Sequence, residues 1–356
     1  MTHVDLILQG YRSWNDASIL NEVGAELEDR ARFEPARIFL ERCIELAPHE
    51  HGVAYIHLAY SHFRDSTSPG AMERGMAILR RGLQQTDSDH LASVLATWLS
   101  SEEEEEAQQL LSRAAARCND ADILTISSIR MWRGGAAEAV AALGNIDDTV
   151  RRVLGSDDGC LMADVGHMLY HLSTEGLIPF EERSIDVLLD SGMSTYPDVF
   201  DVFRTATSVY RSQNKWEEVG AVCRRGLVEI PDEETLMMNL AIANTKLGDF
   251  GHAEKWFLRA IGAKPSFAGA RIGLAQLYDS LGRADEAVET AREVISANPA
   301  YLFGYAQVAA ILDKNGLSSE GVELLRSVRE SLAPWMIRSI ERDEAMRTVW
   351  NKLNEH

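Results

Sequence analysis

The stretch AEKWFLRAIGAKPSFAGARIGLAQLYDSLGRADEAVETAREVISANP, residues 253–299, carries one pattern of residue sizes twice. The two copies are 34 residues apart, so that Ala253 and Pro265 correspond to Ala287 and Pro299. The charged residues at corresponding positions differ between the copies. Size is restricted where side chains pack, whereas charge can vary where side chains face water. The stretch therefore predicts a packed structural unit that is repeated along the chain.

The same columns of residues continue on both sides of this stretch. Proline recurs at the same spacing, at Pro197, Pro231, Pro265 and Pro299. Twelve positions before each proline stands a small or apolar residue, and this column continues one period further on at Gly321: Ile185, Val219, Ala253, Ala287 and Gly321. Apolar residues three and four positions apart indicate helices, and a glycine such as Gly248 or Gly282 interrupts each unit midway. Proline lacks an N–H and restricts the residue before it, so it ends the second helix. Each unit is predicted to be two helices and a turn.

One unit can be compared directly with a known repeat. Its positions follow the outline W-x2-L-G-x2-Y…A-x3-F-x2-A…P, with Met in place of Trp and Asn in place of Tyr: Met237, Leu240, Ala241, Asn244, Ala253, Phe257, Ala260 and Pro265. The chain thus resembles the tetratricopeptide repeat (TPR) family over most of residues 17–334. A further unit has an insertion around DSTSPGAME, residues 65–73. The resemblance implies an all-α fold, a right-handed α-solenoid of stacked helix-turn-helix (TPR-like) repeats.

The repeats suggest an order of segments along the chain. The segment GNIDDTVRRVLGSDDGC, residues 144–160, fits no unit and is interpreted as part of a joint between two arrays. Amphipathic segments at both ends are predicted to cover the apolar faces of the outermost repeats. The predicted segments are an N-terminal capping helix (1–16), an N-terminal TPR-like array (17–143), an irregular joint (144–165), a C-terminal TPR-like array (166–334) and a C-terminal capping helix (335–356).

Charge and composition restrict the class of partner. The chain has 35 basic and 55 acidic residues, a net charge of −20. This charge repels nucleic acid and anionic lipid surfaces. The first residues, MTHVDLILQG, lack the basic segment and long apolar run of a targeting signal, and no stretch reaches the length of a membrane span. We therefore expect a cytoplasmic protein that binds neither nucleic acid nor membrane.

Motifs for chemistry are sparse in this sequence. The four cysteines are far apart and form no C-x-x-C pair, so we expect reduced thiols that pack as small apolar residues: Cys43, Cys118, Cys160 and Cys223. The phosphate-binding, dinucleotide-binding, nucleophile-elbow and zinc-protease motifs do not occur. The sequence predicts a protein that is not an enzyme and has no cofactor.

The resemblance also implies a place for binding. In this family the first helix of each unit forms a concave wall that receives a peptide or helix from a partner. The residues predicted to face this partner-binding groove are Arg204, Ser208, Arg211, Thr235, Met238, Ile242, Ile272, Gln276 and Phe303. The apolar ones would anchor an apolar side chain, and the arginines could hold an acidic end. We expect a non-catalytic scaffold or adaptor, with two alternatives open for the apolar residues: the superhelix itself covers them, or self-association does.

A second function is conceivable in the degenerate middle of the chain. In CLMADVGHMLYHLSTE, residues 160–175, helical spacing puts His167, His171 and Glu175 on one stripe. Two histidines one turn apart can share a metal ion, and a carboxylate can be a third ligand. The same stripe is also the polar face of an ordinary amphipathic helix. The alternative hypothesis is a metal-dependent protein or enzyme with its site around His167 and His171.

Overall fold

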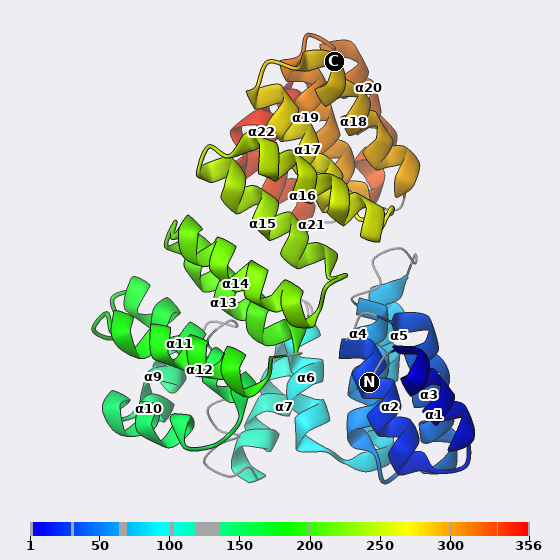
Figure 1. Ribbon diagram of the computed structural model, residues 1–356, viewed down its shortest axis with the longest axis vertical. Helices are drawn as coiled ribbons and strands as arrows, with labels where there is room; N and C mark the ends of the chain where they lie inside the picture. Colours follow the sequence, from blue (N-terminus) through cyan, green and yellow to red (C-terminus); the bar gives the residue numbers. More distant parts are fainter. Residues whose placement is uncertain are drawn as a thin grey trace. The chain divides into compact units, whose positions relative to one another are not determined.

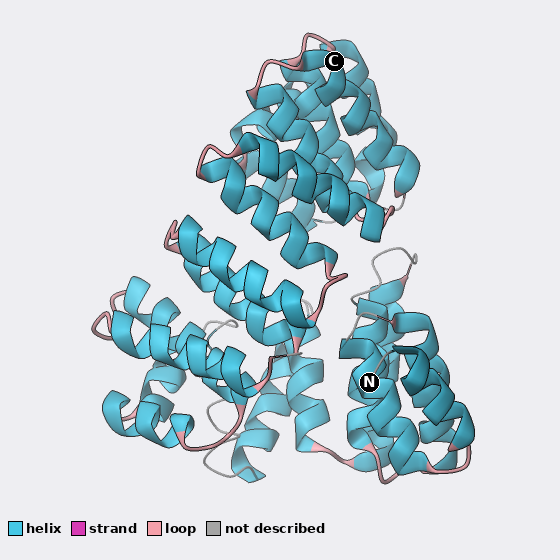
Figure 2. Cartoon of the chain, viewed as in Figure 1, coloured by secondary structure: helices cyan, strands magenta, loops and turns pink. Residues whose placement is uncertain are grey.

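A computed structural model describes residues 3–29, 32–63, 70–99, 103–117, 131, 135–197, 199–299, 301–332 and 334–354. Within these ranges the chain forms helices joined by short loops, and contains no strand (Figure 2). The chain divides into two compact units, Met1–Gln213 and Asn214–His356, which are described separately below (Figure 1). The predicted all-α solenoid of stacked helix-turn-helix repeats is confirmed.

The first unit consists of helical hairpins and a terminal helix. Its helices are α1 (His3–Arg12), α2 (Ala17–Asp29), α3 (Phe33–Leu46), α4 (Gly52–Phe63), α5 (Ala71–Thr86), α6 (Asp89–Trp98), α7 (Glu104–Arg117), α9 (Ala136–Leu143), α10 (Ile146–Leu154), α11 (Gly159–Thr174), α12 (Glu182–Thr195) and α13 (Phe200–Ser212). Successive helices pair as α2 with α3, α4 with α5, α6 with α7 and α11 with α12. Helix α1 lies on α2, and one apolar core runs from α1 to α7.

The second unit is more regular. Its helices are α14 (Trp216–Glu229), α15 (Glu234–Lys246), α16 (Phe250–Ala263), α17 (Ala268–Ser280), α18 (Ala284–Ala297), α19 (Leu302–Lys314), α20 (Ser318–Val328), the 3₁₀ turn η2 (Arg329–Ser331), α21 (Pro334–Arg342) and α22 (Glu344–Asn354). The hairpins are α15–α16, α17–α18 and α19–α20, and each packs against the next. Helix α22 packs on α19 and α20, where Trp350 joins the core that includes Ala306 and Leu325.

Glycine sets the turn inside each of these three hairpins. Gly248, Gly282 and Gly316 have φ angles of 81°, 72° and 82°, a left-handed conformation that costs glycine little. The residue after each glycine donates its N–H back to the preceding helix, as Asp249 does to the Asn244 carbonyl at 2.8 Å. This hydrogen bond closes the end of the first helix, and the second helix begins at once. The midway glycines of the sequence pattern therefore mark the hairpin turns.

Small residues lie where the paired helices approach each other closely. Ala253, Ala260, Ala287 and Ala291 are fully buried. Gly273 on α17 leaves room for Phe257 of α16, whose Cε1 lies 2.4 Å from the place where a Cβ on Gly273 would be. A larger side chain at these positions would hold the helices apart. Packing therefore explains why residue size is repeated along the chain.

Two predicted boundaries differ from the structure. The segment 144–165, predicted as an irregular joint, contains α10 and the start of α11, whereas the two compact units meet between Gln213 and Asn214. The difference arises because the loop between α11 and α12 is longer than the turns of the second unit, so a strict period of 34 residues misplaces α11. The insertion predicted at residues 65–73 lies largely outside the described residues.

The predicted capping helix 335–356 is also different in the structure. The segment forms two helices, α21 and α22, which are separated at Asp343. The Asp343 carboxylate accepts a hydrogen bond from the Met346 N–H at 2.9 Å, and so caps the start of α22. An amphipathic pattern alone does not show such a break, because the apolar spacing continues across it.

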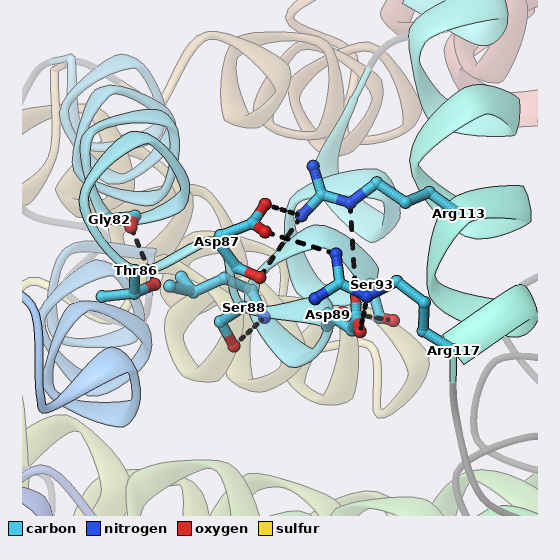
Figure 3. Close-up of polar contacts among 9 residues, drawn as sticks. Gly82, Thr86, Asp87, Ser88, Asp89, Ser93, Arg113 and Arg117 are labelled. Atoms are coloured by element: carbon cyan, nitrogen blue, oxygen red, sulfur yellow. Dashed lines mark hydrogen bonds and ion pairs between the residues drawn. The ribbon is translucent and has the colours of Figure 1, made fainter.

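Ion pairs hold the turn between α5 and α6 to helix α7 (Figure 3). Asp87, with a φ of 52°, pairs with Arg113 at 2.7 Å and with Arg117 at 3.3 Å. Asp89 pairs with Arg117 at 3.1 Å. Ser88 caps α6 by accepting the Leu91 N–H at 3.3 Å. These side chains are largely exposed, so the network orients the turn and adds little free energy of folding.

None of the helices in the described ranges is both long enough and apolar enough to cross a lipid bilayer.

Candidate functional site

The first helices of the second unit form one wall. Helix α17 packs on both α15 and α19, so residues at equivalent positions of the three helices follow one another along this wall. Thr235, Met238 and Ile242 of α15 are half-buried, as is Phe303 of α19, whereas Gln276 of α17 is exposed. The wall thus offers partly accessible apolar side chains next to an amide. This is a surface on which an apolar side chain of a partner could rest.

One predicted member of the groove is not accessible. Ile272 of α17 is only 5% exposed, so the expectation that it is an exposed anchor is wrong. Its helix has a neighbour on each side, and those neighbours cover it. Met238 also contacts α17, because its Sδ lies 3.0 Å from the place where a Cβ on Gly269 would be. The accessible apolar surface is smaller than the sequence suggested and consists of Met238, Ile242 and Phe303.

The three remaining predicted residues belong to the first unit. Arg204, Ser208 and Arg211 are all exposed on α13. Arg204 donates from Nε to the Asp201 Oδ1 at 2.8 Å. The nine residues predicted for one groove are thus distributed over both compact units, six of them in the second.

Arg204 belongs to a polar cluster that sequence periodicity did not indicate. Burial raises the pKa of Asp164 on α11 to about 7, although the nearby Arg204 acts in the opposite direction. Burial lowers the pKa of His167 to about 4, and Arg204 adds to this effect. Burial raises the pKa of Tyr60 on α4, and Asp201 raises it further. Tyr60 of α4 therefore lies within electrostatic range of Asp201 and Arg204 of α13, although more than a hundred residues separate the two helices in the sequence.

The metal hypothesis receives no support from the arrangement around α11. His171 Nε2 lies 3.2 Å from Glu175 Oε1, so these two side chains form an ion pair when the imidazole is protonated. Among the residues that the structure describes, no three His, Cys, Asp or Glu side chains converge as metal ligands do. The stripe of His167, His171 and Glu175 is therefore explained by an amphipathic helix.

The three cysteines that the structure describes form no disulfide bond with one another. Cys43 and Cys223 are buried and Cys160 is half-buried, while Cys118 lies outside the described residues. Burial raises the pKa of the Cys43 thiol to about 11, which keeps it protonated and unreactive at neutral pH. Cys43 and Cys223 thus pack as small apolar residues.

The comparisons with known proteins agree with this fold. Residues 235–267 and 268–301 each match the family model of the tetratricopeptide repeat. A crystal structure of MamA is 19% identical with a TM-score of 0.36, over 45% of this chain and 91% of MamA. A crystal structure of PilW, described as a widely conserved type IV pilus biogenesis factor, is 16% identical with a TM-score of 0.46, over 65% of this chain and all of PilW. No curated protein sequence matches the chain.

The matched units, α15–α16 and α17–α18, are tetratricopeptide repeats. The resemblance inferred from Met237 through Pro265 is confirmed. Repeats of this class support a role as a protein-interaction scaffold.

The polar cluster makes stability depend on pH in two opposite ways. Between about pH 4 and 6.5, Asp164 keeps its proton only in the folded state, so its contribution to the free energy of unfolding falls as pH rises. His167 takes up a proton only in the unfolded state over this range, so its contribution rises with pH. Each limiting slope is up to about 1.4 kcal/mol per pH unit, reduced by solvent screening, and the two nearly cancel.

We expect single variants to expose these opposed contributions. In Asp164→Asn the free energy of unfolding should rise from pH 4 to 6.5, because His167 is then the only member of this pair that titrates. In His167→Gln it should fall from pH 4 to 7. Urea titrations at several pH values measure both slopes. The charged or titratable groups that act on this pair are Arg204, Asp201, Asp158 and His171. If the free energy of unfolding had the same pH dependence in both variants and in the unmodified protein, the opposed contributions of Asp164 and His167 would be contradicted.

Proposed function

We propose that this protein is a non-catalytic scaffold or adaptor that holds a peptide or helix of another protein against the inner wall of its second unit. The proposal rests on one feature, the half-buried apolar residues on the first helices of successive hairpins. Met238 and Ile242 lie on α15 of a tetratricopeptide repeat, and Phe303 lies on α19 of the hairpin that follows the two matched repeats. Fully buried side chains could not contact a partner, whereas these half-buried side chains still have exposed surface that a partner can bury. Exposed Gln276 would hydrogen-bond to the partner's main chain.

Local packing supports a preformed surface. Met238 is held against the first turn of α17, and the α15–α16 hairpin is fixed by a part-buried ion pair of Glu234 with Lys264 at 2.9 Å. A partner would therefore meet side chains that are already positioned, and less conformational entropy would be lost on binding. The partner would bring an apolar side chain as its anchor.

A binding experiment tests this assignment. The purified protein should retain one dominant, stoichiometric partner from extracts of its own source cell. Met238→Asp combined with Ile242→Asp should reduce that retention at least tenfold, because a charge would be buried against the apolar anchor. Since Met238 is partly packed, Gln276→Arg is a second variant that adds charge and bulk to the wall without touching the core.

The control is an apolar residue away from this wall. Leu258 on α16 is 50% exposed, and Leu258→Asp should leave partner retention unchanged. Thermal melts of all variants establish that each is folded. If Gln276→Arg and the Met238/Ile242 variant retain the partner as well as Leu258→Asp does, the wall is not the binding site.

A further inference from the structure

The loop between α11 and α12 is longer than the turns inside the hairpins of the second unit, and three of its four extra residues are apolar. In α15–α16, α17–α18 and α19–α20 three residues separate the two helices, whereas residues 175–181 separate α11 from α12. Helix α11 ends in the same way as the others, with Gly176 at a φ of 73° and the Leu177 N–H bonded to the Leu172 carbonyl at 2.9 Å. The loop therefore continues for four residues beyond a complete helix cap: Ile178, Pro179, Phe180 and Glu181.

Two apolar residues of this loop, Leu177 and Phe180, face water. Leu177 is 47% exposed and Phe180 is 53% exposed. Val187, on the outward face of α12, is also exposed, whereas Ile185 and Leu188 beside it are buried in the hairpin. A turn needs no phenylalanine, and an exposed aromatic ring is unfavourable in water. We refer to the exposed apolar residues of this loop, Leu177 and Phe180, as the tip surface.

The surroundings of the tip surface are strongly acidic. Glu175, Glu181, Glu182 and Asp186 lie in the loop or in the first turns of α12. Residues 175–187 include these four acidic residues and one basic residue, Arg183. The first unit as a whole, residues 1–213, has 34 acidic and 18 basic residues, against 21 and 17 in the second. Most of the net charge of the protein is therefore in the unit that carries the tip surface.

We propose that the tip surface is a second docking site, for a segment of another protein that combines apolar side chains with lysine or arginine. The apolar side chains would cover Leu177 and Phe180, and the basic ones would lie among the surrounding carboxylates. A second copy of the chain would bring its own acidic unit against this one. Nucleic acid and anionic lipid are repelled by the same charge. The site is separate from the proposed wall on α15, α17 and α19.

A defined peptide tests the proposal without knowledge of the natural partner. The probe is a fluorescein-labelled amphipathic peptide of leucine and lysine, about 18 residues long so that it can form a helix. Its binding to the full chain is measured by fluorescence anisotropy at physiological salt. We expect saturable binding, weakened at least tenfold by Leu177→Ser with Phe180→Ser, and similarly by Glu181→Lys with Glu182→Lys.

Matched controls separate this site from general charge attraction and from the groove. Val228→Ser with Leu258→Ser alters two exposed apolar residues of the second unit and should leave the peptide affinity unchanged. Met238→Asp with Ile242→Asp, the variant that tests the proposed function, should also leave the peptide affinity unchanged. The experiment can therefore contradict the docking site at the tip surface without contradicting the proposed function. A peptide with glutamate in place of lysine should not bind.

Three results would overturn the proposal. The leucine–lysine peptide could fail to bind, or it could bind the Leu177/Phe180 variant as well as the unmodified chain, which would indicate diffuse charge attraction alone. In sedimentation experiments the chain could form dimers that Phe180→Ser dissociates, which would identify a second copy as the occupant. Because Leu177 and Phe180 are exposed, their serine variants should fold normally, and a circular dichroism melt verifies this.

Discussion

Replacing Phe257 by alanine should lower the free energy of unfolding of the protein by about 3–5 kcal/mol. Phe257 is 2% exposed, and its ring lies over Gly273 of the next helix. The ring thus joins the first tetratricopeptide repeat to the second. Its removal loses the burial of an aromatic side chain and leaves a cavity that the two backbones cannot readily close. Urea denaturation followed by circular dichroism measures the change.

The adjacent residue is the matched control for this prediction. Leu258 is on the same helix but 50% exposed, so Leu258→Ala should change the free energy of unfolding by less than about 0.5 kcal/mol. The two substitutions remove similar kinds of atoms from neighbouring positions. Equal effects would mean that the buried stripe of α16 has been assigned to the wrong face.

Replacing Gly321 by valine should destabilise the protein by about 1–3 kcal/mol. Gly321 on α20 occupies the column of Ala253 and Ala287, and a Cβ on it would lie 2.7 Å from the Ala309 carbonyl oxygen of α19. A backbone oxygen cannot move aside as a flexible side chain can. The two helices must therefore separate, although valine favours a helix more than glycine does.

A second glycine distinguishes this clash from a general effect of valine. Gly262, near the end of α16, has no atom within 4 Å of the place where its Cβ would be. Gly262→Val should be neutral or slightly stabilising, because only the helix propensity changes. A decrease in stability of the same size in both variants would contradict close contact between α19 and α20.

The sequence predicted the hairpins well because each one is a local structure. Glycines at 248, 282 and 316 and prolines at 231, 265 and 299 mark where helices end, and apolar spacing marks which face is buried. These signals depend on residues a few positions apart, and the repeat multiplies them. The inserted loop at 175–181 was missed, because a fixed period has no place for extra residues.

The exposure of the residues proposed for the wall was predicted only in part. The spacing correctly assigned Met238, Ile242 and Phe303 to the first helices, but it could not show that Ile272 is covered from both sides. Periodicity describes contacts between successive repeats. It carries no information on residues such as Tyr60 and Arg204, which come together only when many repeats have folded into one unit.

The central claim, that partners bind the inner wall of the second unit, is tested most directly by photo-crosslinking inside the source cell. A photoreactive amino acid is placed either at Gln276 on α17 or at Glu289 on α18, two exposed positions of one hairpin on different helices. We expect a discrete crosslinked partner from position 276 and none from position 289. Crosslinking that is equal at the two positions, or confined to 289, would contradict the account.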